Sequence, residues 1–409
     1  MPQSPPGMVL GPSNFRFYLM VRVLTATATE MQALAVAWQV YSLTHRPLDL
    51  GLVGLAQFLP GVLLFLVTGQ TADRFPRQRI LQACCAGFAL CSLLLLGLTW
   101  HGVSSTLPIY GVLLFNGTVR AFNGPAGQAF LPLLVPVERF PQAVAWNSSI
   151  FQGATIAGPV VGGLLYGWTA SPTIVYGCAA IEYVAALAVL GGIRVLAAQE
   201  RRPAAFYSTA LEGLRYIGRN KLILGTISLD LFAVLLGGAV ALLPVYAREI
   251  LKIGASGLGL LRSAPGFGAV IMALVVARWP LQRHAGAIML WCVGGFGMFT
   301  VVFGFSRNLA LSLAALTLIG ACDMVSVIVR HTLVQLSTPD EMRGRVSAVN
   351  VVFIGASNEV GQFESGLTAQ WFGTVPAVVL GGLGTIAVVV LWAWRFPALR
   401  RVDALVRRG

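Results

Sequence analysis

Charged side chains are scarce in this sequence. Asp, Glu, Lys and Arg make up 11% of its 409 residues, against about 25% in a typical soluble chain. This number of charges is too small to cover the surface of a water-soluble protein of this length. The shortage argues against a soluble enzyme and predicts that much of the surface faces lipid.

Motifs that bind nucleotides or carry out hydrolysis are also missing. The sequence has no G-x-x-x-x-G-K-S/T loop, no H-E-x-x-H pair, no G-x-S-x-G turn and no dinucleotide fingerprint after a strand. We therefore expect no enzyme activity and no cofactor.

Cysteine is present but offers no disulfide or metal pattern. The six cysteines all fall in apolar stretches, and none has zinc-like spacing to a histidine. We expect them to be small buried apolar side chains. They are Cys84, Cys85, Cys91, Cys178, Cys292 and Cys322.

Long apolar runs dominate what is there. Hydrophobic residues make up 56% of the chain, and the mean hydropathy is +0.78. A membrane-spanning helix needs about 20 apolar residues, and breaks at Pro, Gly and charge clusters delimit twelve such stretches. The predicted spans are 17–43, 49–70, 80–100, 107–127, 141–167, 173–194, 222–246, 256–277, 285–305, 309–336, 345–371 and 375–395.

The net charge of +13 is a signal of topology. Lys and Arg gather at the chain ends and in alternate loops, which places both termini in the cytoplasm and argues against nucleic acid as a partner. The opening MPQSPPGMVLGPSN lacks the regions of a cleaved signal peptide, so we expect the first span to direct insertion.

A polar interruption divides the predicted spans into six and six, as in many transporters. We expect an N-terminal bundle over 1–194, a cytoplasmic linker over 195–221, a C-terminal bundle over 222–396 and a basic tail over 397–409.

The loop after the second span reads GQTADRFPRQRI, residues 69–80. It resembles the G-x-x-x-D-R-x-G-R-R/K signature of the major facilitator superfamily, with Pro76 and Gln78 as departures. By this resemblance the loop would be a gate latch, in which an acid pairs with a base or a helix N-terminus in one conformation only. The matching residues are Gly69, Asp73, Arg74, Arg77 and Arg79.

Two further elements resemble the same superfamily. RAFNG in the fourth span is similar to its R-x-x-Q-G element, and Asn116, Arg120 and Asn123 share one helix face. GATIAGPVVGG in the fifth span is similar to the G-x-x-x-G-P-x-x-G-G element of its proton-coupled exporters, with an alanine for the first glycine. Small residues there would let helices touch, and the proline would permit the helix to bend. The gating candidates in that element are Gly158, Pro159, Gly162 and Gly163.

The resemblance extends over nearly the whole chain. The stretches 34–44, 51–61, 229–247 and 338–350 are similar to a bacterial branch with enterobactin-exporter-like and drug-efflux-like members. The resemblance implies an all-α membrane protein of twelve helices in two six-helix bundles.

Ionisable residues inside membrane spans mark ion or substrate paths. Our candidates for proton coupling are Glu30, Asp323, Glu359 and Arg120. For each of them the alternative role is that of a partner in a static ion pair. Arg330 pairing with Glu359, or Asp323 with Arg262, are alternatives that sequence leaves open.

Other polar residues in the spans are candidates for lining a substrate cavity. They are Gln32, Asn116, Asn123, Asp230, Arg330, Asn358, Gln362 and Glu364.

These features favour a monomeric secondary transporter in a bacterial inner membrane. Its partners would be a small molecule, protons and the lipid bilayer, and no metal is expected. The preferred function is proton-coupled export of an amphipathic siderophore-like or drug-like compound by alternating access. An importer, a lysophospholipid-type flippase and a non-transporting sensor remain alternatives.

Overall fold

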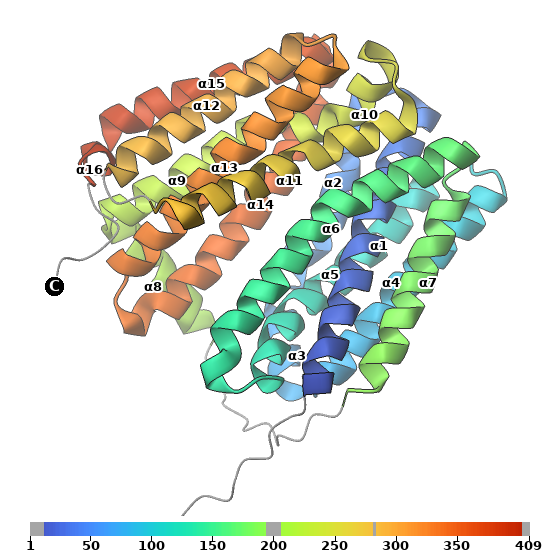
Figure 1. The fold of residues 1–409 in the computed structure, drawn as a ribbon, viewed down its shortest axis with the longest axis horizontal. Helices are drawn as coiled ribbons and strands as arrows, with labels where there is room; N and C mark the ends of the chain where they lie inside the picture. The colour runs from blue at the N-terminus through green and yellow to red at the C-terminus, as the bar shows by residue number, and fades with distance from the viewer. Residues whose placement is uncertain (1–11, 194–205, 281–283, 403–409) are drawn as a thin grey trace, which may run out of the picture. The chain divides into compact units, whose positions relative to one another are not determined.

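The computed structural model describes residues 12–193, 206–280 and 284–402. Every regular element in these ranges is helical (Figure 1), which confirms the all-α prediction for them. The helices are α1 (Pro12–Thr44), α2 (Pro47–Leu63), α3 (Phe65–Arg74), α4 (Arg77–Trp100), α5 (Leu107–Phe130), α6 (Phe140–Thr169), α7 (Thr173–Gly191), α8 (Phe206–Arg219), α9 (Lys221–Leu236), α10 (Leu243–Val245), α11 (Gly254–Arg278), α12 (Ala285–Phe305), α13 (Leu309–Ser337), α14 (Asp340–Phe372), α15 (Thr374–Arg395) and α16 (Pro397–Arg400). Short 3₁₀ turns lie at Leu131–Leu133, Val137–Arg139 and Ala239–Leu242, and a π-helical turn lies at Tyr246–Ile250.

Helices occupy all twelve stretches that the sequence predicts as spans, but two of the stretches are interrupted. The second consists of α2 and α3, which meet at Leu64. In the seventh, α9 ends before Gly237 and short turns continue to Ile250. The predicted linker also contains a helix, α8, which was not predicted from the sequence.

Within the described ranges, eight helical segments are long and apolar enough to cross a membrane. Helices α1, α5 and α14 have 33, 24 and 33 residues, but polar and charged residues lower their hydropathy. Long helices of mixed polarity are typical of membrane proteins with polar interiors.

The chain divides into two compact units. The first comprises Met1–Val36 and Ala56–Ala204, and the second comprises Ala37–Leu55 and Ala205–Gly409. The short segment Ala37–Leu55 thus groups with the later part of the chain.

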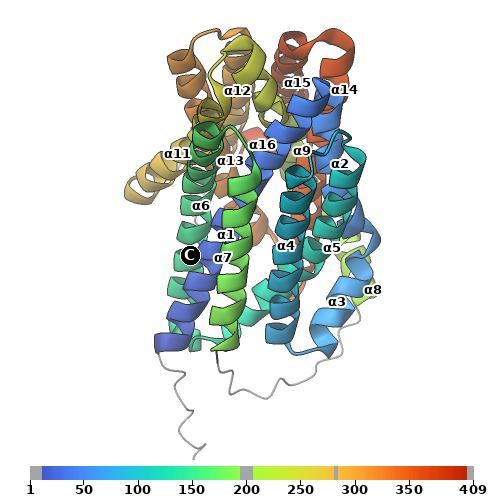
Figure 2. The same cartoon turned by 90° about the vertical axis from the view of Figure 1, so that its right-hand side faces the viewer.

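In the first unit, α4 packs against both α5 and α7 (Figure 2). The rings of Phe88 and Tyr183 stack with centroids 5.3 Å apart, and the hydroxyl groups of Tyr183 and Thr29 lie 2.9 Å apart. These contacts join α1, α4 and α7 around a buried apolar cluster.

In the second unit, α13 packs against α11 and α12, and α12 packs against α15 (Figure 1). Glycines permit these close approaches. A Cβ on Gly320 would lie 2.6 Å from the Pro265 Cα, and Cβ atoms on Gly297 and Gly382 would lie 2.8 and 2.7 Å from each other's carbonyl oxygens. Since lipid supplies no hydrophobic force between helices, such contacts are a main source of packing energy.

The segment Ala37–Leu55 contacts later elements of the same unit. Tyr41 donates a hydrogen bond to Glu249, and Arg248 donates one to Ser42. A Cβ on Gly51 would lie 2.9 Å from the Phe363 Cα, so α2 meets α14 backbone to backbone.

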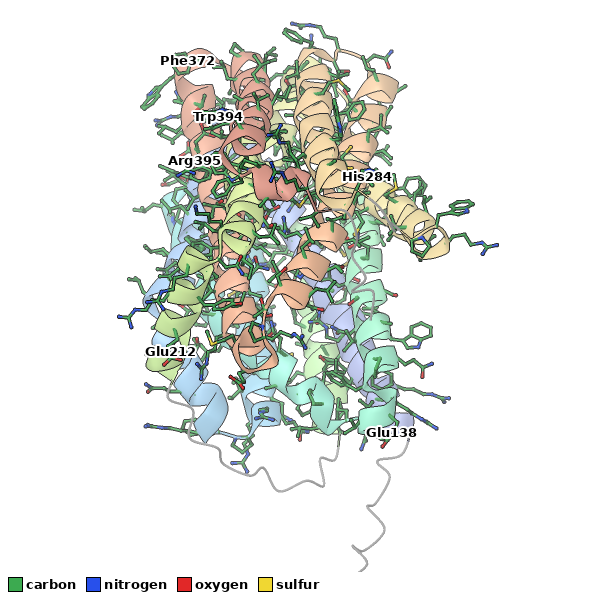
Figure 3. All side chains as sticks on the ribbon, turned by 90° about the vertical axis from the view of Figure 1, so that its left-hand side faces the viewer. Glu138, Glu212, His284, Phe372, Trp394 and Arg395 are labelled. Carbon is green, nitrogen blue, oxygen red and sulfur yellow. The ribbon has the colours of Figure 1, made fainter. Side chains whose placement is uncertain are left out.

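Large apolar side chains point outward from the helices. Phe372 and Trp394, seen in Figure 3, are 61% and 74% exposed, and Trp291 is 81% exposed. Such a surface is unfavourable in water and suits a bilayer.

We predict that Gly320→Ala will destabilise the protein while Gly355→Ala will not. The added methyl at position 320 overlaps the Pro265 backbone, whereas a Cβ at position 355 meets no atom within 4 Å. Overpacking of this kind costs about 1–3 kcal/mol. Thermal unfolding of the two variants in detergent measures the difference, and equal midpoints would contradict it.

Candidate functional site

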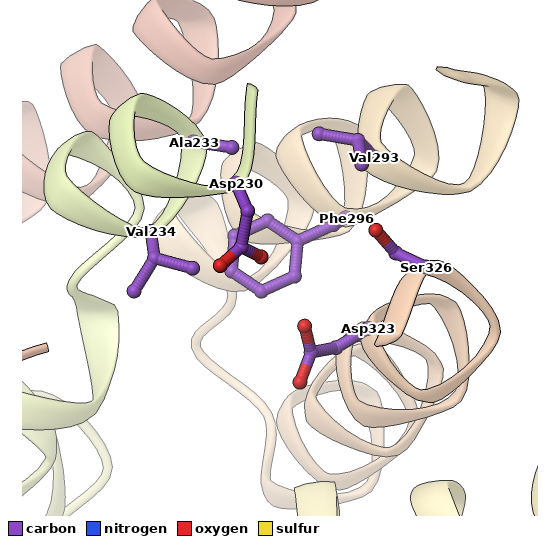
Figure 4. Close-up of a pocket in the computed structure, with 7 residues that line it drawn as sticks. All are labelled: Asp230, Ala233, Val234, Val293, Phe296, Asp323 and Ser326. Carbon is purple, nitrogen blue, oxygen red and sulfur yellow. The ribbon is translucent and has the colours of Figure 1, made fainter. Parts of the chain in front are cut away.

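A pocket between α9, α12 and α13 contains two acids. Figure 4 shows the carboxylates of Asp230 and Asp323 directed into the space between α9 and α13. Apolar side chains form the rest of the wall, with the Ser326 hydroxyl as a further polar group. The lining residues are Asp230, Ala233, Val234, Val293, Phe296, Asp323 and Ser326.

Asp230 forms an ion pair with Arg330. The side chains are 10% and 3% exposed, respectively, so both charges are buried. Within the described part of the chain, the Arg330 Nε has no hydrogen-bond partner. A buried guanidinium that lacks its counter-ion is strongly destabilising, so this pair holds α9 and α13 at a fixed level.

Two hydrogen bonds from α15 support the direction in which Asp230 points. The Thr385 hydroxyl donates to the Ala233 carbonyl at 3.0 Å, and the Trp392 indole donates to the Ser228 hydroxyl at 2.9 Å. Both come from α15. They fix the rotation of α9, with Asp230 turned toward α13.

The partner of Arg330 differs from both sequence-based alternatives. Pairing with Glu359 is wrong, because Arg330 contacts Asp230 instead. Nor is Asp323 joined to Arg262, because no ion pair or hydrogen bond connects Asp323 to another side chain in the ranges the structure covers. Sequence spacing relates residues on one helix and does not reveal which neighbouring helix supplies the counter-ion.

The polar group of α14 is bonded largely within its own helix. The Asn358 amide donates to the Ile354 carbonyl at 3.0 Å, the Gln362 amide donates to Glu359 at 3.3 Å, and Thr368 donates to Glu364 at 2.7 Å. None of these residues lines the pocket between α9, α12 and α13.

In the first unit, the small residues of α6 pack on α1. A Cβ on Gly158 would lie 2.6 Å from the Glu30 Cβ, and one on Gly162 would lie 3.0 Å from the Met31 Cα. Pro159 and Gly163 are buried in the same helix. The glycines therefore allow close approach beside Glu30, which is half-buried.

The other polar candidates of the first unit are dispersed. Gln32 is 5% exposed and accepts a hydrogen bond from Ser92 at 2.5 Å. On α5, Asn116 is buried, Asn123 is half-buried and Arg120 is exposed. The structure thus places Gln32 in a helix contact and gives the three residues on α5 different surroundings.

In the loop motif, Gln78 donates to the Leu190 and Ile193 carbonyls at 2.9 and 2.7 Å. Arg77 donates to the Ala129 carbonyl at 3.0 Å, near the end of α5, where a cation suits the helix dipole. Arg74 and Arg79 are exposed, and Gly69 has open space beside it. The side chain of Asp73 lies outside the part of the chain that the structure describes.

Phe296 and Ser326 also line the pocket, although neither was predicted from the sequence. The position of Ser326, three residues after Asp323 on one helix face, was a usable signal. Phe296 lies in an apolar run without any distinguishing pattern, so only the packing of α12 reveals it.

The family model described as transmembrane secretion effector matches residues 9–407. The chain is 25% identical over 393 residues to the enterobactin exporter EntS of Shigella boydii serotype 4 (strain Sb227), covering 95% of this chain and 92% of that relative. The EntS of Escherichia coli O139:H28 (strain E24377A / ETEC) matches with the same identity and coverage.

Solved structures share the fold. A bacterial homologue of the iron transporter ferroportin has a TM-score of 0.69 at 15% identity, over 93% of this chain and 98% of that one. A bacterial homologue of the human lysosomal transporter Spinster has a TM-score of 0.73 at 11% identity, and the match covers 94% of this chain and 98% of that one. The D-xylose-proton symporter has a TM-score of 0.69 at 14% identity, and the match covers 93% of this chain and 97% of that one.

The chain therefore belongs to the transmembrane secretion effector family of the major facilitator superfamily. Members of this superfamily are multi-pass membrane transporters of small molecules and not enzymes.

We predict that Asp230→Asn and Arg330→Gln will each lower stability by about 3–5 kcal/mol, because each leaves a buried charge without a partner. The double variant should lose less than the sum of the two, since it buries no charge. Thermal unfolding of the wild type, the two single variants and the double variant in detergent gives the four values of this double-mutant cycle.

The exposed pair between Glu212 and Arg345, whose side chains are 46% and 36% exposed, is the matched control. Its cycle with Glu212→Gln and Arg345→Gln should give about 0–1 kcal/mol of coupling. Equal coupling in the two cycles would show that burial does not strengthen the Asp230–Arg330 pair.

Proposed function

We propose that this chain is a secondary active transporter that exports an amphipathic, siderophore-like or drug-like small molecule in exchange for protons. It would act as a monomer in a bacterial inner membrane, with twelve spans and both termini in the cytoplasm. Two six-helix bundles, 1–194 and 222–396, would alternate in opening their shared cavity to each side.

The observation that carries the proposal is a set of acids within long helices, two of them in one pocket with apolar walls. Ionisable groups inside membrane spans are retained for ion or substrate movement by default. In the second unit, Asp230 and Asp323 line the pocket. In the first, Glu30 lies against Gly158 of α6. Glu359 on α14 is a further candidate.

Export is favoured over import by the relatives. The family description refers to secretion, and the curated relatives are named enterobactin exporters. The GPVVGG element in α6 agrees with this direction, because it resembles the proton-coupled exporters of the superfamily. At 25% identity the substrate can differ, so we propose a class of compounds rather than enterobactin itself.

The gate would use both motifs of the first unit. The loop residues Gly69, Asp73, Arg74, Arg77 and Arg79 would latch the cytoplasmic side. Gly158 and Gly162, which contact α1, would provide a smooth surface along which α6 slides. Pro159 would permit α6 to bend.

Deletion of the gene should cause the substrate to accumulate in cells and to disappear from the culture medium. Mass spectrometry of both fractions, from iron-poor and iron-replete cultures, measures this. Re-expression of the wild-type chain is the control. A compound left in the medium of the mutant culture would instead establish uptake and remove the export proposal.

We predict that at least one of Glu30→Gln, Asp323→Asn and Glu359→Gln abolishes efflux driven by a proton gradient. Neutral amides keep the shape of each side chain but cannot exchange a proton. Accumulation of substrate in inside-out vesicles, where export runs inward, measures coupling when it is compared with and without an uncoupler. Wild-type coupling in all three variants would exclude these residues as proton sites.

A further inference from the structure

The pocket in the second unit has an unbalanced set of charges. Its helix α12 contains no Asp, Glu, Lys, Arg or His. Besides Asp230, α9 carries only Lys221, an exposed residue at its first position, about 13 Å along the axis from Asp230. On α13 the ionisable groups are Asp323, Arg330 and His331, and His331 is exposed.

Among the residues that the structure describes, no Lys, Arg or His from the helices packed around these three lines the pocket. On α15 the only charged residue is Arg395, in the last turn. On α11, Arg262 lies one turn before Pro265, where that helix meets α13, and Arg278 lies at the far end.

Helix α14 directs its acids elsewhere. Glu359 lies beside Gly54 of α2, where a Cβ would be 3.3 Å from its Oε2, and accepts from Gln362. Glu364 accepts from Thr368. The groups at the pocket are therefore two carboxyls and one guanidinium, which together carry one negative charge when all are ionised.

Asp323 is half-buried, and an unpaired negative charge beside apolar walls is unfavourable, so one proton on the pocket removes this cost. Arg330 is already paired with Asp230, so the proton belongs on the other acid. Asp323 faces the same pocket from α13, among apolar side chains and one turn from the Ser326 hydroxyl (Figure 4). Protonation of one Asp323 carboxyl oxygen leaves a neutral acid beside a neutral ion pair.

We infer that Asp323 is the group that takes up and releases the coupling proton, and that Arg330 is a positioning residue that keeps Asp230 ionised. The proton would bind a carboxylate oxygen of Asp323 from water on one side of the membrane and return to water on the other side. This inference rests on the proposed function and deepens it by selecting one acid among the candidates.

The test uses the purified full chain and dicyclohexylcarbodiimide, an apolar reagent whose C=N bond adds the O–H of a protonated carboxyl group. Mass spectrometry of the digested protein locates the label. We expect label on Asp323, decreasing about tenfold per pH unit once the carboxyl ionises, and none on Asp230. In Arg330→Gln, which lacks the partner of Asp230, label should also appear on Asp230.

Label on Asp230 rather than Asp323 in the wild-type protein would overturn the assignment, as would absence of label on Asp323 across pH 5–9. Thermal unfolding supplies a second measurement, which does not depend on access of the reagent.

Asn at position 323 resembles the protonated acid, so Asp323→Asn and wild type should unfold at the same temperature at low pH. As pH rises, the wild type loses the proton, and its midpoint should fall below that of the variant. Glu182→Gln, in α7 of the first unit, is the matched control and should leave the second-unit pH response unchanged. A constant difference between wild type and Asp323→Asn at all pH values would overturn the inference.

Failure of the proposed function is distinguishable from failure of this assignment. Efflux that is insensitive to an uncoupler would refute proton coupling, whatever the labelling shows. Uncoupler-sensitive efflux that persists in Asp323→Asn would leave coupled transport intact and refute the role of Asp323.

Discussion

The ion pair between Arg330 and Asp230 places demands on much of the second unit. A guanidinium that is 3% exposed must meet a carboxylate at the same depth, so α9 has to be held both in height and in rotation. The Asn220 side chain caps the start of α9 by accepting from the Leu222 and Ile223 amides. Hydrogen bonds from α15 hold its middle, and α9 ends before Gly237.

The helices must also approach one another closely in a medium that does not drive them together. Glycines, which have no side chain, permit this approach. Where α9 ends, Gly238 lies against α14, and a Cβ there would be 2.8 Å from the Gly361 carbonyl. In the first unit the contact of Gly158 with Glu30 uses the same principle. Both units therefore combine a membrane acid with helices that touch through glycine.

Much of this organisation can be predicted from the residues. Long apolar runs located the helices, and the element around Gly158 and Pro159 correctly indicated a close helix contact. The partner of Arg330 could not be predicted, because the choice between Asp230 and Glu359 depends on how α9 and α14 are rotated about their axes. The break at Gly237 was missed since glycine is common within membrane helices.

The contact between Gly297 and Gly382 is reciprocal, since a Cβ on either residue would meet the carbonyl oxygen of the other. The requirement for glycine at one position cannot be removed by a substitution at the other. A side chain at either position collides with the backbone of the facing residue, and every residue type has that backbone. We therefore expect the two positions to evolve together. Both should remain glycine in relatives that keep α12 and α15 in contact, and both should accept other residues in relatives in which these helices are apart.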